Sequence, residues 1–230
     1  MLWEQVTYKD ESDMQLPSHL ADMFIKRSKI ITKSAKQTLI SQSDTSDDVY
    51  YIAQGQVRVS VLAPNSKEYI FREIGPGNLI GELAALDGGK RSVMVTTIKD
   101  TLFYGMTQCT FKKLLEQNKE FSDYLRLSLV KRVRNLSEQV FELSTMNVRC
   151  RILLDLIRRA KKSALEDGSA TFNLPKDQVK VAIALATHRE AISREYSSFA
   201  KNGFIKKHNE KIVVPSIERL ESLLSKLMGL

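Results

Sequence analysis

Glycines, one carboxylate and one arginine are gathered in residues 75–94, and together their chemistry suits an anionic ligand. Five of the ten glycines lie between positions 75 and 89. Glycine lets a backbone approach a ligand closely, and free N–H groups in a short turn bind anions. Glu82 interrupts an otherwise apolar run, and Arg91 and Ser92 follow about nine residues later.

This combination predicts a site for a phosphorylated sugar. Arg91 offers a fork of donors to a phosphate, and Ser92 adds a hydroxyl. Glu82 would repel a phosphate but can accept hydrogen bonds from sugar hydroxyls. An anion site beside a hydroxyl-binding carboxylate indicates a nucleotide. The alternative is an ion pair between Glu82 and Arg91 in a glycine-rich turn that binds no ligand.

Short β-rich runs in residues 29–107 surround this site and must position it. They alternate with turn signals, a pattern typical of a sandwich or jelly roll. The clearest runs are 49–52, 57–61, 69–71, 93–97 and 102–104. A short helix is predicted at 16–24, and the glycine-rich site is expected to be a helical interruption of the β domain.

A helical period follows from Thr110 to about Met146, which is long for a globular helix. Its apolar residues recur at alternating spacings of four and three, as in a coiled-coil seam. The seam consists of Leu129, Val133, Leu136, Val140 and Leu143. Because a narrow apolar stripe needs a partner, we predict a parallel homodimer through residues 125–143. The alternative is a helix that lies on its own β domain.

Two adjacent helix starts predict a helix-turn-helix. Asp177 is placed to cap the first helix, and Thr187 with Glu190 has the form of a capping box for the second. Apolar spacing turns Ile192, Tyr196 and Phe199 inward. The outer face then holds His188, Arg189, Glu190, Ser193 and Arg194.

That outer face suits DNA. In the major groove an arginine reads guanine and a glutamate reads cytosine, while Gln178 can reach a phosphate. A hairpin predicted at 204–214 adds a wing whose lysines favour phosphates. The alternative is a basic three-helix packing module. An amphipathic helix at 216–228 extends beyond the wing, and the sequence assigns it no role.

The distribution of charge supports a polyanion partner for the second half of the chain. Residues 126–230 carry 20 Lys and Arg against 11 Asp and Glu, whereas residues 1–125 carry 15 against 16. The basic part therefore stands apart from a neutral one.

Composition excludes several other classes of protein. Cys109, Cys150 and the three scattered histidines have no metal-ligand spacing, so we expect no metal and no disulfide framework. No apolar run approaches the roughly 20 residues of a membrane span, and the acidic start is unlike a signal peptide. We therefore expect a cytoplasmic protein without a membrane partner.

Gly81, Glu82 and Leu83, followed by Arg91 and Ser92, resemble the phosphate-binding cassette of the cyclic-nucleotide-binding domains in the Crp/Fnr family of transcription regulators. The likeness is greatest to the catabolite-activator branch of that family. There the glutamate binds the ribose 2′-hydroxyl, and the Arg-Ser pair binds the cyclic phosphate. The resemblance implies the same roles for these residues.

The long helix resembles its counterpart in the same branch, where a Thr-Ser pair reaches the adenine and the serine comes from the second subunit. Ser137 matches that serine, but Leu136 stands in place of the threonine and offers no side-chain hydrogen bond. Arg132 matches an arginine near the ligand and is expected to face Glu82. Ser137 favours cyclic AMP as the effector. Because Leu136 removes one contact to the base, cyclic GMP is the second choice.

The C-terminal part continues the resemblance, which covers roughly residues 30–215. Arg189, Glu190 and Arg194 match the Arg-Glu and Arg of the family's recognition helix. Ala186 stands where the turn of the family usually has glycine, so a strained turn is expected there.

Together these observations predict an α+β protein in three parts. They are a β jelly-roll cyclic-nucleotide-binding domain (1–109), a dimerisation helix with hinge (110–146) and a winged helix-turn-helix domain (147–230). We predict a homodimeric transcription regulator, not an enzyme, which binds double-stranded DNA, contacts RNA polymerase and is gated by cyclic AMP or cyclic GMP. Two alternatives stay open. One is a ligand-independent regulator held in its DNA-binding state by the seam helix, and the other is a cyclic-nucleotide-regulated enzyme or a plain binding subunit.

Overall fold

The computed structural model describes residues 15–64, 68–174 and 178–229, the last range without the side chains of 178–180. The chain divides into two compact units, with the boundary between Arg132 and Val133. This boundary falls inside the long helix, so the three-part division expected from the sequence stays a prediction. No helix among the described residues is long and apolar enough to cross a membrane.

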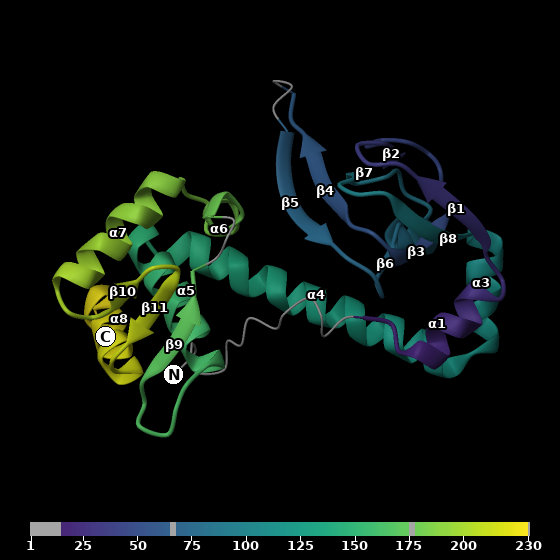
Figure 1. Ribbon diagram of the computed structural model, residues 1–230. Helices are drawn as coiled ribbons and strands as arrows, with labels where there is room; N and C mark the ends of the chain where they lie inside the picture. The colour runs from purple at the N-terminus through teal and green to yellow at the C-terminus, as the bar shows by residue number, and fades with distance from the viewer. Residues whose placement is uncertain (1–14, 65–67, 175–177, 230) are drawn as a thin grey trace. The chain divides into compact units, whose positions relative to one another are not determined.

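The first unit is built on two four-stranded antiparallel sheets (Figure 1), which confirms the predicted β domain. One sheet has the order β1-β8-β3-β6 and the other β2-β7-β4-β5. The strands are β1 (Lys29–Lys33), β2 (Thr38–Ile40), β3 (Val49–Gln54), β4 (Val57–Leu62), β5 (Glu68–Ile74), β6 (Leu79–Ile80), β7 (Met94–Thr97) and β8 (Thr101–Met106). Every strand run that the sequence predicts falls within one of these strands or overlaps it.

Two apolar clusters hold the first unit together. One contains buried side chains of both sheets, including Ile52, Val59 and Phe103. The other joins the strands to helices α1 (Ser18–Ile25) and α3 (Gln108–Gln117). At its centre are three fully buried rings, of Phe24, Phe111 and Phe121, whose centroids lie 6.2–6.5 Å apart.

One sequence prediction about the helices is wrong. The helical period from Thr110 to Met146 forms two helices, α3 and α4 (Lys119–Thr145), because Asn118 leaves the helical conformation at φ −129° and ψ 100°. The side chain of Asn118 then accepts a hydrogen bond from the backbone N–H of Phe121 at 2.7 Å. This asparagine therefore ends one helix and caps the next.

The seam of α4 is partly buried at its start and exposed over the rest of its length. Leu129 packs against the core of the first unit. The other seam residues are 42–62% exposed, and these are Val133, Leu136, Val140 and Leu143. Most of the stripe is thus exposed, as the dimer prediction requires.

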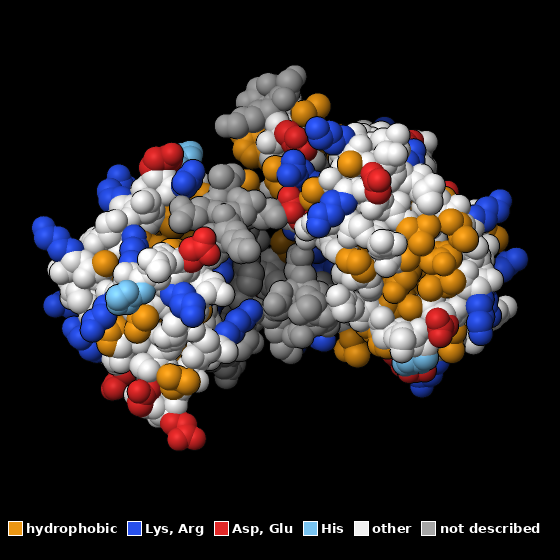
Figure 2. Space-filling view, viewed as in Figure 1, with side chains coloured by type: hydrophobic (Ala, Val, Ile, Leu, Met, Phe, Trp, Pro, Cys, Tyr) orange, Lys and Arg blue, Asp and Glu red, His pale blue; other side chains and the backbone are white. Residues whose placement is uncertain are grey.

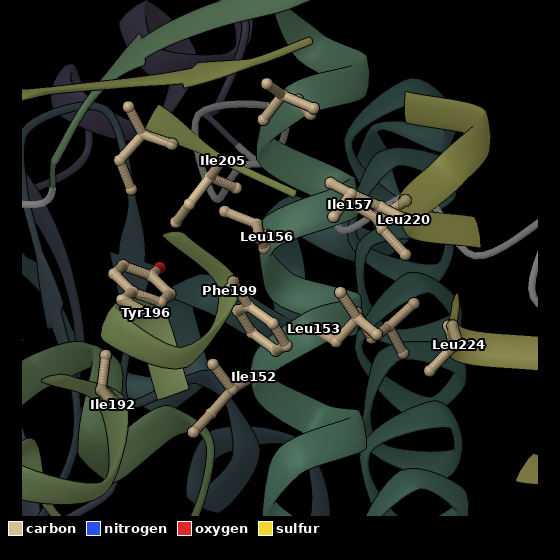
Figure 3. Packing of buried hydrophobic residues seen from close by; sticks show 14 of the residues in the cluster. Ile152, Leu153, Leu156, Ile157, Ile192, Tyr196, Phe199, Ile205, Leu220 and Leu224 are labelled. Atoms are coloured by element: carbon tan, nitrogen blue, oxygen red, sulfur yellow. The ribbon is translucent and has the colours of Figure 1, made fainter. Parts of the chain in front are cut away.

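The second unit packs three helices around α5 (Val148–Lys162). They are α6 (Gln178–Ala184), α7 (Arg189–Lys201) and α8 (Ile217–Met228). Figure 3 shows side chains of α7, among them Tyr196 and Phe199, directed toward those of α5, with Leu220 and Leu224 of α8 beside α5. The predicted helix at 216–228 therefore completes this core, which answers what the sequence left open.

A small sheet and a helix cap complete the second unit. The predicted hairpin is confirmed as β10 (Lys206–His208) and β11 (Lys211–Val214), but β11 also pairs with β9 (Ala170–Asn173), a strand that the sequence did not predict. Asn147 caps α5, because its side chain accepts a hydrogen bond from the N–H of Cys150 at 2.9 Å.

Candidate effector site and nucleic-acid interface

The glycine-rich site is built on a left-handed turn. Gly81 follows β6 with φ +86° and precedes α2 (Glu82–Asp87), the predicted helical interruption. A Cβ atom on Gly81 would lie 2.8 Å from both Arg91 Nη1 and the carbonyl oxygen of Asp48. Glycine is therefore required here for both its backbone conformation and its small size.

Arg91 is drawn into this turn and is only 4% exposed. Its Nη1 donates to the carbonyl of Gly81 at 2.9 Å, its Nη2 to that of Asp48 at 2.7 Å, and its Nε to the Ser46 hydroxyl at 3.1 Å. A guanidinium carries five N–H groups, so about two stay available to another acceptor. Arg91 holds the loop before β3 against the start of α2.

Glu82 lies in the first turn of α2 and is 3% exposed. It forms an ion pair with Arg132 of α4, which confirms the predicted contact. A buried carboxylate needs such a partner, because an unpaired charge in a low-dielectric interior is costly. Next to it Leu83 is 47% exposed, and Ser92 is also exposed.

The structure thus places four of the predicted effector residues in two directly contacting pairs. Gly81 and Arg91 share a hydrogen bond, and Glu82 and Arg132 share an ion pair. Leu136 and Ser137 belong to the second compact unit. There Leu136 is 60% exposed, and the Ser137 hydroxyl donates to the Val133 carbonyl at 2.9 Å.

This set of groups fits a ligand that carries both an anion and a hydroxyl. The exposed Ser92 hydroxyl and the remaining N–H groups of Arg91 suit a phosphate, and Glu82 has a second oxygen for a sugar hydroxyl. Within the described residues, no group of three or more His, Cys, Asp or Glu side chains is arranged to hold a metal ion.

The second candidate site is the helix-turn-helix of α6 and α7. Residues 185–188 join the two helices, and Ala186 takes the left-handed conformation with φ +46°, the strain expected for this turn. The predicted capping box is wrong by one residue. His188 is the N-cap of α7 without a side-chain capping bond, so Glu190 stands one position too early to bond back to the cap.

The two faces of α7 are as predicted. Ile192, Tyr196 and Phe199 are buried. The predicted DNA-reading residues are exposed, namely His188, Arg189, Glu190 and Arg194. Gln178 begins α6, but its side chain and the expected cap Asp177 lie outside the described part of the structure.

The wing beside α7 is basic. Lys206 and Lys211 are exposed, and the Lys207 ammonium lies 5.8 Å from the centre of the Tyr196 ring. On the face that Figure 2 shows, lysine and arginine side chains are spread over the unit that contains α7 and this sheet.

Sequence reasoning missed two buried arginines on α5. Arg151 is 9% exposed and Arg158 is 8% exposed. Arg158 pairs with Glu142 of α4, and Arg151 donates to three backbone carbonyls. The sequence carried a signal of their burial. Positions 151, 154 and 158 share one face of a helix, and Leu154 between the two arginines is apolar.

Comparison with known proteins identifies the two parts of the chain. A cyclic nucleotide-binding domain model matches residues 31–118, and a Crp-like helix-turn-helix domain model matches residues 150–223. The chain is 27% identical over 212 residues to the cAMP-activated global transcriptional regulator CRP of Haemophilus influenzae, covering 92% of this chain and 94% of that protein.

Solved structures share the fold at lower identity. A structure of CprK complexed with OCPA superposes with a TM-score of 0.78 at 16% identity, covering 91% of this chain and 94% of that one. A CooA mutant from Carboxydothermus hydrogenoformans gives a TM-score of 0.72 at 18% identity, covering 92% of this chain and 99% of that one.

Proposed function

The chain is a member of the Crp/Fnr family of transcription regulators, close to the catabolite activator protein, and from this premise we propose a homodimer whose DNA binding is gated by a cyclic nucleotide. Its cyclic nucleotide-binding and helix-turn-helix domains make it a DNA-binding regulator. The proposal concerns the identity of the effector, the residues that bind it and the way in which it acts.

We assign the effector site to the turn around Gly81. Glu82 would accept from the ribose 2′-hydroxyl, while Arg91 and Ser92 would hold the phosphate with N–H groups near Leu83. Cyclic AMP is the first choice, because the Haemophilus influenzae relative is cAMP-activated, and cyclic GMP is the second. The CprK complex with OCPA is a reason to test the choice, since a related fold there holds another compound.

The Glu82–Arg132 pair supports a route from this site to the rest of the protein. Arg132 lies on α4, and seam residue Leu136 follows one turn later on the same helix. A change in the partners of the Glu82 carboxylate therefore changes a contact that holds α4 to α2. In a dimer joined through residues 125–143, with Leu136 and Ser137 at the shared seam, both subunits would respond together.

One observation carries the DNA-binding proposal. Arg189, Glu190 and Arg194 are exposed on α7 while the opposite face is buried. Two such helices in a dimer would enter successive major grooves, about 34 Å apart, where Arg reads guanine and Glu reads cytosine. Gln178, His188 and the wing lysines would contribute phosphate contacts, and RNA polymerase is the expected further partner.

A second candidate is a regulator that needs no ligand. It is favoured by the internal partners of the two signature residues, since Arg91 bonds to three protein oxygens and Glu82 pairs with Arg132. In that case the same contacts would hold the active state permanently, and the exposed seam around Leu136 would supply the dimer.

One experiment tests both candidates. Nucleotide-stripped protein is titrated with cyclic AMP and cyclic GMP by calorimetry, and its affinity for a duplex selected by the protein from a random pool is measured by anisotropy. We expect cyclic AMP to tighten DNA binding about tenfold. Ser92→Ala should weaken nucleotide binding by about tenfold, because a bond to a charged group is lost. Ser34→Ala, also exposed in the same unit, is the control.

Equal DNA affinity with and without both nucleotides would support the ligand-independent regulator. Failure to select any duplex would overturn both candidates.

A further inference from the structure

Arg151 joins two segments that are far apart in the sequence. It lies in the first turn of α5, and its Nη1 donates to the carbonyl of Met146 at 2.7 Å. Its Nε donates to the carbonyl of Leu185 at 3.0 Å, and its Nη2 to that of Ala186 at 3.2 Å. One buried guanidinium therefore holds oxygens at the end of α4 and in the turn before α7.

The three carbonyls are ones that a helix cannot satisfy by itself. Met146 directly follows α4, and Leu185 and Ala186 follow α6. The last carbonyls of a helix lack intrahelical partners and lie at the negative end of its dipole. A cation that donates to several such oxygens is well matched to them, which explains why an arginine can be buried in this core.

We infer that Arg151 positions the DNA-reading helix by coupling the turn before α7 to the end of α4. Ala186 holds a left-handed conformation that alanine disfavours, and Arg151 bonds to its carbonyl. The start of α7 is then fixed with respect to the seam helix. This inference rests on the proposed function, because α7 matters for DNA only if it reads DNA.

Arg158 provides a matched control. It lies seven residues further along the same helix, has nearly the same exposure as Arg151, and joins α5 to α4 through Glu142. Loss of either arginine removes a buried contact between these two helices. The hydrogen bonds from Arg151 to Leu185 and Ala186 distinguish the two sites.

The test compares Arg151→Met with Arg158→Met in the full chain. Hydrogen exchange reports on the amides of residues 185–187, which donate to carbonyls of α6. Anisotropy gives the DNA affinity with the selected duplex. We expect both variants to lose stability to a similar extent. Only Arg151→Met should speed exchange at 185–187 and weaken DNA binding, each by about tenfold.

Arg151→Lys keeps the charge without the fork, so an intermediate loss of DNA affinity is expected. It also serves as the test variant, beside Arg158→Lys, if the methionine variants do not fold. Equal effects of the paired substitutions on exchange and affinity would overturn the inference, as would an unchanged Arg151→Met. If the wild type binds no DNA, the proposed function fails, while exchange at 185–187 still decides whether Arg151 holds the turn.

Discussion

Two turns of this protein use the same device in different units. Gly81 and Ala186 both take left-handed backbone conformations, with φ values of +86° and +46°, and a helix starts shortly after each. A buried arginine donates to the carbonyl of each turn residue, Arg91 to Gly81 at 2.9 Å and Arg151 to Ala186 at 3.2 Å. One turn belongs to the candidate effector site and the other to the DNA-reading element.

The turns differ in the space around the left-handed residue. A Cβ atom on Gly81 would meet Arg91 and Asp48 at 2.8 Å, whereas Ala186 is exposed and has room for its methyl group. The first turn therefore accepts only glycine, and the second tolerates a side chain at the cost of backbone strain. The need for glycine thus depends on how closely neighbouring side-chain and backbone atoms approach the turn residue.

Replacing Gly81 tests the crowded turn and should have the largest effect. Gly81→Ala should lower the free energy of unfolding by about 3 kcal/mol or more, because the clash adds to the cost of a left-handed alanine. Urea denaturation measures the loss. Gly88→Ala is the matched control, since Gly88 has φ +71° with nothing within 4 Å of its Cβ position, and it should cost about 1 kcal/mol.

Equal losses in the two variants would mean that both Arg91 and the Asp48 carbonyl move away freely. The proposed difference between the turns would then be wrong.

The same contrast explains what the sequence could predict. Gly81 and Arg91 are 10 residues apart in one recognisable stretch, so both could be identified as site residues. Arg151 and Ala186 are 35 residues apart, and only folding brings them together. Ala186 was identified as a strained position from the resemblance, but the arginine that bonds to it was not.

Local sequence patterns predicted an element well where the spacing of its apolar residues alone determines which face is buried. The buried face of α7 with Ile192, Tyr196 and Phe199 is an example. Prediction failed where a single backbone angle decides, as at Asn118, which divides the long helical segment, and at His188, which displaces the expected cap. It also missed β9, because that strand is completed only by pairing with β11.

Replacing Ala186 tests the open turn and should have a smaller effect of opposite sign. Ala186→Gly should raise the free energy of unfolding by about 0.5 kcal/mol, because relief of left-handed strain exceeds the extra entropy of glycine in the unfolded chain. Urea denaturation again gives the change. Ala184→Gly, at an exposed position in α6, should instead lower stability by about 1 kcal/mol. A loss for Ala186→Gly would mean that the turn carries no strain.

One buried tyrosine in each unit has a raised pKa, and comparing the two gives the smallest expected effect. Burial raises the pKa of Tyr50, where Asp48 acts in the same direction and Arg91 opposes it. Burial also raises the pKa of Tyr196, with Asp155 acting in the same direction and Arg159 opposing it, and this shift is the larger. Both folded pKa values lie above that of the unfolded chain, so the stability each contributes is complete well below about pH 10, begins to fall as the pH approaches that value and is lost as it rises further.

Removing the hydroxyl of Tyr196 should therefore reduce the fall in the free energy of unfolding at alkaline pH. Tyr196→Phe cannot ionise, so between pH 7 and pH 10 it should lose about 0.4 kcal/mol less than the wild type. Urea denaturation across that range measures the difference, with Tyr50→Phe as the counterpart in the first unit. At higher pH the benefit of Tyr196→Phe should exceed that of Tyr50→Phe, because the folded state resists ionisation longer at Tyr196. Parallel pH profiles for Tyr196→Phe and the wild type would show instead that the ring gains solvent before it ionises.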